Sequence, residues 1–315
     1  MPCRRSASIR AYRTALATGV LALTWLQLSG CAAHRAFDPY RDLGQGDLRH
    51  DGLRRGYSVS TVRGRGFAHA VVVPAGQNSA PILWVFLEGD GQPLVDGGRR
   101  IARDPSPKIA MAFDLFTATS APRAYLGRPC YFSHANDAGC DPSLWTSARY
   151  GKAAVASMAA ALETLIRDNS TRRVILVGYS GGGTIAYLVA PRIPEVSAVI
   201  TICGNLDIDA WTRTHGYPSL SQSDNPATAP PLDRRITQIA IAGGRDVNVP
   251  QSSLRAFLDR QQPQELWIYG DHDHACCWRR DWPAILNRIG DRLEESLPAA
   301  RAEASDAAVA AEGPH

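Results

Sequence analysis

Short runs of apolar residues alternate with helix-like segments from about residue 81 to residue 297. The apolar runs are PILWVFLEG (81–89), RRVILVG (172–178), SAVITICG (197–204), TQIAIAGG (237–244) and ELWIYG (265–270). Continuous apolar runs of this length are typical of strands that are buried on both faces, as in a parallel sheet. The sequence therefore predicts an α/β fold, with a mostly parallel central sheet and helices on both of its faces.

Other segments complete the expected domain, residues 57–297. Helices are predicted at 105–116, 147–169, 252–261 and 281–297, and directly after the glycines at 181–183. Residues 57–74 alternate by twos, which predicts an antiparallel pair at one edge, and 123–127 form a short strand. Residues 205–236 are polar and Pro-rich, and we expect a lid-like excursion there. Trp211, His215 and Tyr217 either border a substrate site or pack within this excursion.

The composition and net charge limit the kinds of molecule that this chain is expected to bind. The chain has 315 residues, of which 45% are hydrophobic and 20% are charged, as in an ordinary globular protein with one large domain. Its formal net charge of +4 comes entirely from the four arginines within residues 1–30, because the rest carries 30 basic and 30 acidic residues. A near-neutral chain has no general attraction to nucleic acid, which we therefore do not expect as a partner.

The N-terminus has the layout of a lipoprotein signal peptide (1–30). Arginines precede the apolar stretch 15–28, which is short for a transmembrane span, and LSGC (28–31) resembles a bacterial lipobox. We predict that Cys31 is lipidated and that residues 31–56 tether the domain to the membrane. An aspartate directly after the lipidated cysteine usually marks retention in the inner membrane. Ala32 takes that position here, which favours an exported lipoprotein on the outer membrane, facing the periplasm. An ordinary signal peptide with a chance cysteine is the alternative. Residues 298–315 are predicted to be a disordered tail.

The cysteines suit an exported protein, because disulfides persist outside the cytoplasm. Cys130 and Cys140 bracket a polar loop, and we predict a disulfide between them. Cys203 lies in an apolar run and is expected to be a buried thiol. Cys276 and Cys277 could form a vicinal disulfide, pair elsewhere or stay reduced; five cysteines beyond residue 31 leave at least one thiol unpaired.

The stretch VGYSGGGT (177–184) places Ser180 in a GxSxG pattern between a predicted strand and a predicted helix. In that context the serine occupies a sharp turn, the nucleophile elbow, and the N–H of Gly181 faces the developing oxyanion. The alternative is a glycine-rich turn that only packs a helix on a strand. A phosphate loop is disfavoured, because no lysine follows the glycines.

A serine nucleophile needs a base and a third group that orients the base. Asp246 follows the predicted strand 237–244 and is our candidate acid, with Asp207 and Asp209 as alternatives. The run DHDH (271–274) follows the last predicted strand, and we favour His274 over His272 as the base. A metal site in this cluster of aspartates and histidines is disfavoured. Zinc usually needs a third and a fourth ligand at a recognisable spacing in the sequence, and none is evident here. We expect neither a metal nor a cofactor.

The second oxyanion donor is expected after the strand that ends at LEGDG (87–91). The N–H of Asp90 is the first choice and that of Gly91 the second, and the alternative is a simple Gly/Asp turn. The Asp90 carboxylate should point away, since a negative charge near the oxyanion would oppose catalysis.

These motifs together resemble the α/β-hydrolase superfamily. LEGDG, GYSGGG (178–183), GGRDVNVP (243–250) and DHACCW (273–278), with the RPC segment at 128–130, are similar to a group of exported bacterial α/β-hydrolases of uncharacterised substrate. The resemblance supports His274, the histidine spaced before Cys-Cys-Trp, and implies a serine hydrolase of ester or related acyl substrates. Peptide or amide hydrolysis, or a non-catalytic lipoprotein that uses the fold for binding, are the alternatives.

Overall fold

The computed structural model describes residue 48, residues 55–108 and residues 110–296. All of them belong to one compact unit, Asp38–His315. The predicted signal peptide, the lipidation site Cys31, the tether up to residue 54 (except residue 48) and the predicted tail lie outside the described residues. Among the described residues, no helix combines the length and the apolar character needed to cross a bilayer.

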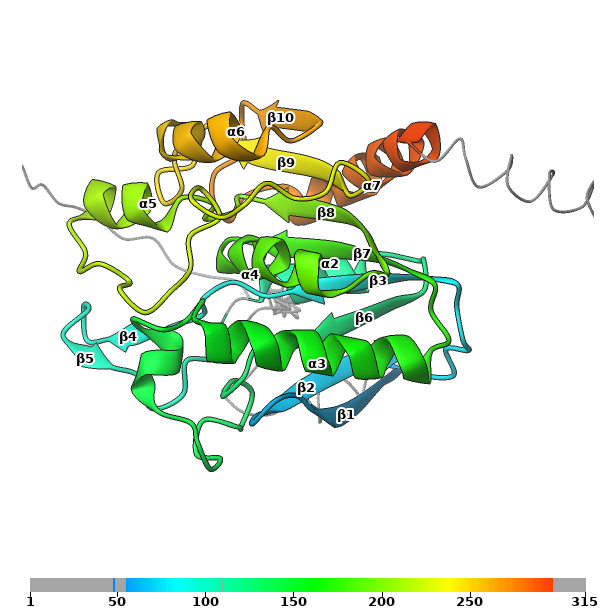
Figure 1. Ribbon diagram of the computed structural model, residues 1–315, viewed down its shortest axis with the longest axis horizontal. Helices are drawn as coiled ribbons and strands as arrows, with labels where there is room; N and C mark the ends of the chain where they lie inside the picture. The colour runs from blue at the N-terminus through cyan, green and yellow to red at the C-terminus, as the bar shows by residue number, and fades with distance from the viewer. Residues whose placement is uncertain (1–47, 49–54, 109, 297–315) are drawn as a thin grey trace, which may run out of the picture. The chain divides into compact units, whose positions relative to one another are not determined.

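One eight-stranded sheet forms the centre, in the order β1-β2-β6-β3-β7-β8-β9-β10 (Figure 1). Its strands are β1 (Tyr57–Arg63), β2 (Ala68–Pro74), β3 (Ile82–Leu87), β6 (Arg123–Leu126), β7 (Arg173–Tyr179), β8 (Val196–Ile202), β9 (Thr237–Gly243) and β10 (Glu265–Tyr269). The strands from β6 to β10 in this order run parallel, while β2 is antiparallel to both β1 and β6. The predicted parallel sheet with an antiparallel edge pair is confirmed.

Helices cover both faces of the sheet. They are α2 (Met111–Thr117), α3 (Lys152–Asp168), α4 (Gly181–Val189), α5 (Ile208–His215), α6 (Arg255–Gln261) and α7 (Trp278–Ser296), with short 3-10 turns at Pro142–Trp145, Ala190–Arg192 and Gln251–Leu254. Alternate residues of β3 enter different cores: Leu83 packs with α3, α4 and α6, whereas Trp84 packs with α2 and α7. Figure 1 shows α3 and α4 in front of the sheet.

The structure corrects two expectations about the elements. The helix predicted at 105–116 begins only at Met111. Pro107 disfavours helical backbone at the residue before it, and residues 105–108 and 110 are not helical. The excursion 205–236 contains α5, which Asp207 caps by accepting hydrogen bonds from the N–H groups of Asp209 and Ala210. The rest of the excursion has neither helix nor strand.

The sequence did not reveal a small second sheet. It is an antiparallel hairpin of β4 (Leu94–Val95) and β5 (Arg100–Ile101). Each strand has only two residues, which is too short to show an alternation of apolar and polar residues in the sequence. Figure 1 shows this hairpin and α5 at the same end of the molecule, to the left.

Candidate active site

Ser180 occupies a strained turn between β7 and α4. Its backbone angles are φ 50° and ψ −122°, a region that residues with a side chain rarely adopt. The Ser180 N–H donates to the carbonyl of Ile202 (2.9 Å), and the Ser180 carbonyl accepts from the N–H groups of Gly183 and Asn205. The neighbouring ends of β7, β8 and α4 therefore hold this conformation in place.

The glycines around Ser180 are required by close backbone contacts. A Cβ atom on Gly178 would overlap the backbone of Gly182. A Cβ atom on Gly182 would overlap the carbonyl oxygen of Leu87, at the end of β3. Helix α4 thus begins directly against two strands, and this proximity is the structural condition for a nucleophile elbow.

Ser180, His274 and Asp246 form one hydrogen-bonded chain. His274 Nε2 lies 3.1 Å from Ser180 Oγ, and His274 Nδ1 lies 2.8 Å from Asp246 Oδ2. The other carboxylate oxygen of Asp246 accepts from the backbone N–H groups of Asn248 and Val249, each at 2.8 Å. Each of the three residues follows the carboxyl end of a parallel strand, β7, β9 or β10. This arrangement can transfer a proton from the serine hydroxyl to the imidazole.

Asp246 is buried but stays acidic. Burial alone would raise its pKa, but the hydrogen bond and charge of His274, with the N–H of Val249, lower the pKa below its usual value. The thiol of Cys203 lies in the same environment, where burial and the Asp246 charge raise its pKa well above the usual value. Cys203 is a buried free thiol, as predicted.

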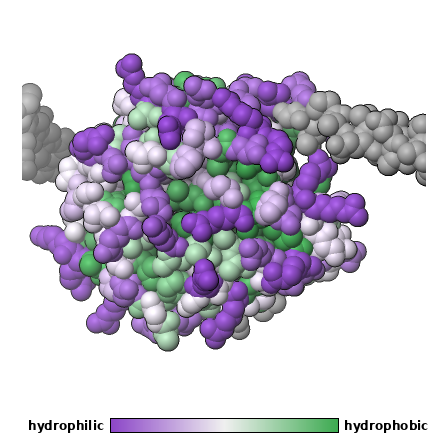
Figure 2. Space-filling model, viewed as in Figure 1, coloured by the Kyte–Doolittle hydropathy of each residue, from purple (hydrophilic) through white to green (hydrophobic). Residues whose placement is uncertain are grey.

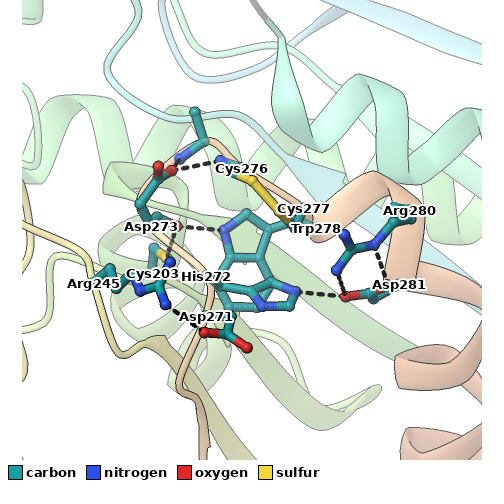
Figure 3. Close-up of a disulfide and its surroundings, with 11 residues drawn as sticks. Cys203, Arg245, Asp271, His272, Asp273, Cys276, Cys277, Trp278, Arg280 and Asp281 are labelled. Carbon is teal, nitrogen blue, oxygen red and sulfur yellow. Dashed lines mark hydrogen bonds and ion pairs between the residues drawn. A yellow bond between two sulfur atoms is a disulfide. The ribbon is translucent and has the colours of Figure 1, made fainter.

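The other acidic and histidine side chains of the loop after β10 have separate partners. Figure 3 shows Asp271 paired with Arg245 and the buried His272 turned toward Asp281, with 3.0 Å between His272 Nε2 and Asp281 Oδ2. The Asp273 carboxylate accepts from the N–H groups of Ala275 and Cys276. The run DHDH therefore does not converge on one point, and His274 is its histidine that faces Ser180.

The two alternative acids are occupied elsewhere. Asp207 caps α5, and both Asp207 and Asp209 accept hydrogen bonds from Asn225. Cys203 Sγ, Asp246 and His274 offer ligand-type atoms that all lie within 4.8 Å of one another. However, Asp246 and His274 already use the facing atoms to bind each other and Ser180.

Tyr179 is a site residue that the sequence analysis missed. Its hydroxyl donates to the carbonyl of His274 (2.7 Å), and its ring lies 5.2 Å from the imidazole, measured between centroids. Tyr179 therefore helps to fix the position of His274. Its place in the GxSxG motif does not indicate this role, which arises only because the loop after β10 folds over the end of β7.

Residues 110–305 match the family model described as the dienelactone hydrolase family, which is more than half of the chain. The chain belongs to the dienelactone hydrolase family. This membership confirms the predicted α/β-hydrolase fold and supports a hydrolase function.

Solved structures agree with the fold of this dienelactone hydrolase family member. A putative hydrolase from Agrobacterium vitis is 14% identical, with a TM-score of 0.54 over 75% of this chain and 99% of that one. The proline iminopeptidase-related protein from Thermus thermophilus is 12% identical, with a TM-score of 0.53 over 76% and 98%. Alpha/beta hydrolase domain-containing protein 10 from mouse is 14% identical, with a TM-score of 0.51 over 76% and 99%. No curated protein sequence matches this chain.

In this family member the carboxylate of Asp90 lies close to the elbow, contrary to the expectation that it points away. A Cβ atom on Gly181 would overlap Asp90 Oδ1. Arg128 and Arg149 each bind one Asp90 oxygen, and the single O–H of Tyr150 donates to the carboxylate, with its oxygen 2.7 and 2.6 Å from the two carboxylate oxygens. Burial alone would raise the pKa of Asp90, but the two guanidinium groups lower it to about 2. The carboxylate is thus ionised, and the arginines outweigh its charge.

A cavity of about 940 Å³ opens over the hydrogen-bonded chain. Ser180 and His274 line it, together with Asn205, whose buried Oδ1 has no hydrogen-bond partner within the described part of the protein. Trp211 and Tyr217 also line it, so these two residues of the excursion border the candidate site. His215 packs behind them, 5.3 Å from the ring of Tyr217 between centroids, and its Nε2 lies 2.7 Å from the carbonyl of Asn248.

Proposed function

We propose that the protein is a serine hydrolase of esters or related acyl compounds. The observation that carries the proposal is the hydrogen-bonded chain Ser180–His274–Asp246, of which Ser180 and His274 line an open cavity. In the proposed mechanism Ser180 Oγ attacks the carbonyl carbon and His274 Nε2 takes the hydroxyl proton. Asp246 holds the imidazole in the required tautomer and stabilises its charged form.

The backbone N–H groups of Gly181 and Asp90 are the proposed donors to the oxyanion. Gly181 is the first residue of α4, so its N–H has no acceptor within the helix. Arg128 and Arg149 carry two positive charges against the one negative charge of Asp90, so this cluster has a net positive charge. The net charge supports the assignment, because it stabilises the oxyanion that develops beside the turn. His274 then returns its proton to the leaving group, and water releases the acyl group by the same steps.

Kinetics with single variants test this mechanism. Ser180→Ala and His274→Ala should each lower kcat by about 10⁴-fold or more, and Asp246→Asn should lower it by a comparable factor. Rates of p-nitrophenyl ester hydrolysis by the purified protein provide the measurement, with circular dichroism to show that each variant is folded. A Ser180→Ala protein with undiminished activity would exclude Ser180 as the nucleophile.

We also propose that a lipid on Cys31 anchors the protein to the outer membrane, with the domain in the periplasm. The lipobox-like LSGC and the Cys130–Cys140 disulfide support this location, because disulfides persist in oxidising compartments. Metabolic labelling with an alkyne fatty acid should tag the wild type and Cys3→Ala but not Cys31→Ala. Equal labelling of Cys31→Ala would contradict the anchor.

A further inference from the structure

Exposed apolar side chains gather around the opening of the cavity. The large hydrophobic residues that are exposed in the described part of the chain are Leu94, Ile101, Tyr217, Val247, Leu266 and Ile268. Leu94, Ile101 and Tyr217 line the cavity that contains Ser180 and His274. Exposure of large apolar groups is unfavourable in water, so their concentration at one opening favours an apolar occupant. The face in Figure 2 shows hydrophobic residues open to the surface between hydrophilic ones.

One wall of the opening is the β4–β5 hairpin. Leu94 and Ile101 are directly paired across it, so both side chains stand on the same face of the hairpin. They are 43% and 49% exposed. The base of the hairpin is fixed, because the N–H of Ala102 donates to the carbonyl of Pro93 (2.9 Å). An ion pair between Asp96 and Arg100 braces the turn.

Trp211 and Tyr217 form another part of the lining, and His215 packs with them in one aromatic cluster. Its ring centroids lie 5.2–5.5 Å apart. Asn248 binds two members of the cluster: its side-chain oxygen accepts from the indole N–H of Trp211 (3.4 Å), and its carbonyl oxygen contacts His215 Nε2 (2.7 Å). Asn248 follows Asp246 by two residues, so the cluster is positioned relative to the hydrogen-bonded chain of the site. This part of the lining is therefore preformed.

We propose that the substrate carries an extended apolar chain, which lies between the Leu94–Ile101 face and Trp211 with Tyr217. This inference rests on the proposed ester hydrolysis at Ser180. The cavity volume of about 940 Å³ is at the upper end of the roughly 300–1,000 Å³ typical of small-molecule sites, and an acetyl ester would leave most of it to water. The chain can belong to the acyl group or to the alcohol.

Two ester series test the proposal and distinguish the two sources. p-Nitrophenyl esters with acyl chains of increasing length probe the acyl group, and acetates of alkanols of the same lengths probe the alcohol, all below their critical micelle concentrations. In one series kcat/KM should rise by up to about fourfold for each added methylene group, until the chain extends beyond the cavity. A flat profile in both series would overturn the proposal, even if Ser180→Ala abolishes activity and thus upholds the proposed function.

A matched pair of variants locates the chain. Leu94→Ser/Ile101→Ser removes the hairpin wall, whereas Leu266→Ser/Ile268→Ser removes similarly exposed residues on the edge strand β10, which do not line the cavity. The ratio of kcat/KM for the long ester to that for the short ester should fall about tenfold in the first variant, mainly through KM, and stay at the wild-type value in the second. Equal ratios in both variants would overturn the proposal. Titration with a fluorophosphonate probe gives the concentration of competent enzyme in each sample.

Discussion

Glu88 is an acidic residue whose environment disfavours its charged form. It is buried at the end of β3, and its carboxylate accepts from the N–H groups of Gly89, Ala112 and Phe113 and from the hydroxyl of Tyr125. Burial raises its pKa to about 7, because the loss of water outweighs these hydrogen bonds. The side chain joins the LEGDG loop to the beginning of α2, so its protonation affects the stability of the fold near the site.

The pKa of Glu88 predicts a pH dependence of stability. The unfolded chain releases this proton near pH 4.5, while the folded protein keeps it up to about pH 7. The folded state therefore binds more protons than the unfolded state in this window. As a result, the contribution of Glu88 to the free energy of unfolding falls by about 3 kcal/mol as the pH rises from 4.5 through 7. The buried His69 acts in the opposite direction, because burial lowers its pKa to about 4 and its contribution to stability rises over much of the same window. Urea unfolding of wild type and Glu88→Gln at pH 5 and pH 8 therefore isolates the contribution of Glu88.

Glu88→Gln should remove the contribution of Glu88, so its stability relative to wild type should rise by about 2–3 kcal/mol from pH 5 to pH 8, whatever its absolute stability. Glu163→Gln, an exposed change on α3, is the control and should show the same change of stability with pH as wild type. If Glu88→Gln and wild type change in stability by the same amount between pH 5 and pH 8, Glu88 does not have a raised pKa in the folded protein.

At the level of elements, sequence patterns predicted the residues that follow strands. Ser180, Asp246 and His274 could be found because each one follows the carboxyl end of a predicted strand, and parallel strands bring these ends together. Tyr179 and the arginines around Asp90 could not be found, since their contacts depend on how distant loops pack. The hairpin β4–β5 and α5 were missed because short or polar segments have little periodicity.

The elbow between β7 and α4 should not tolerate a side chain at Gly182. A Cβ atom there meets backbone oxygens of Leu87 and Glu88, which cannot rotate away. Gly182→Ala should therefore lower the free energy of unfolding by about 1–3 kcal/mol and reduce activity as well. In Gly290→Ala, on α7, the new Cβ meets no atom within 4 Å, and this control should raise stability by up to about 1 kcal/mol. Thermal unfolding of both variants provides the comparison, and similar behaviour would exclude steric crowding at the elbow.

On the scale of the whole molecule, the disulfides fasten loops that the sheet does not hold. The Cys130–Cys140 bond, as predicted, closes the segment after β6, and its Cα atoms are 5.7 Å apart. Cys276 and Cys277 are bonded to each other, which resolves the three alternatives left open by the sequence. This second bond lies in the loop between β10 and α7, which also contains His274. Figure 3 shows the bond between Asp273 and Trp278 along the chain.

Loss of the Cys130–Cys140 bond should destabilise the protein without altering the site. For a loop of this length, chain entropy alone predicts a loss of about 3 kcal/mol in the free energy of unfolding for Cys130→Ala/Cys140→Ala. Urea denaturation under oxidising conditions measures the loss. The same stability in wild type and variant would show that this bond does not restrain the unfolded chain.

The chain also contains a second serine–histidine hydrogen bond, which can be compared with the one between Ser180 and His274. His69 Nε2 lies 2.7 Å from Ser157 Oγ, but both residues are fully buried and neither lines the cavity. A serine–histidine contact alone therefore does not define the reactive residue. Access to the cavity and the support of Asp246 distinguish Ser180.

Covalent labelling with a fluorophosphonate probe tests the central proposal most directly. The wild-type protein and a folded Ser157→Ala variant should both be labelled, with intact mass increased by one phosphonyl group and the modified peptide containing Ser180. A folded Ser180→Ala variant should not react. Labelling of Ser180→Ala at the wild-type rate, or no labelling of the folded wild type, would contradict the assignment of Ser180 as the nucleophile.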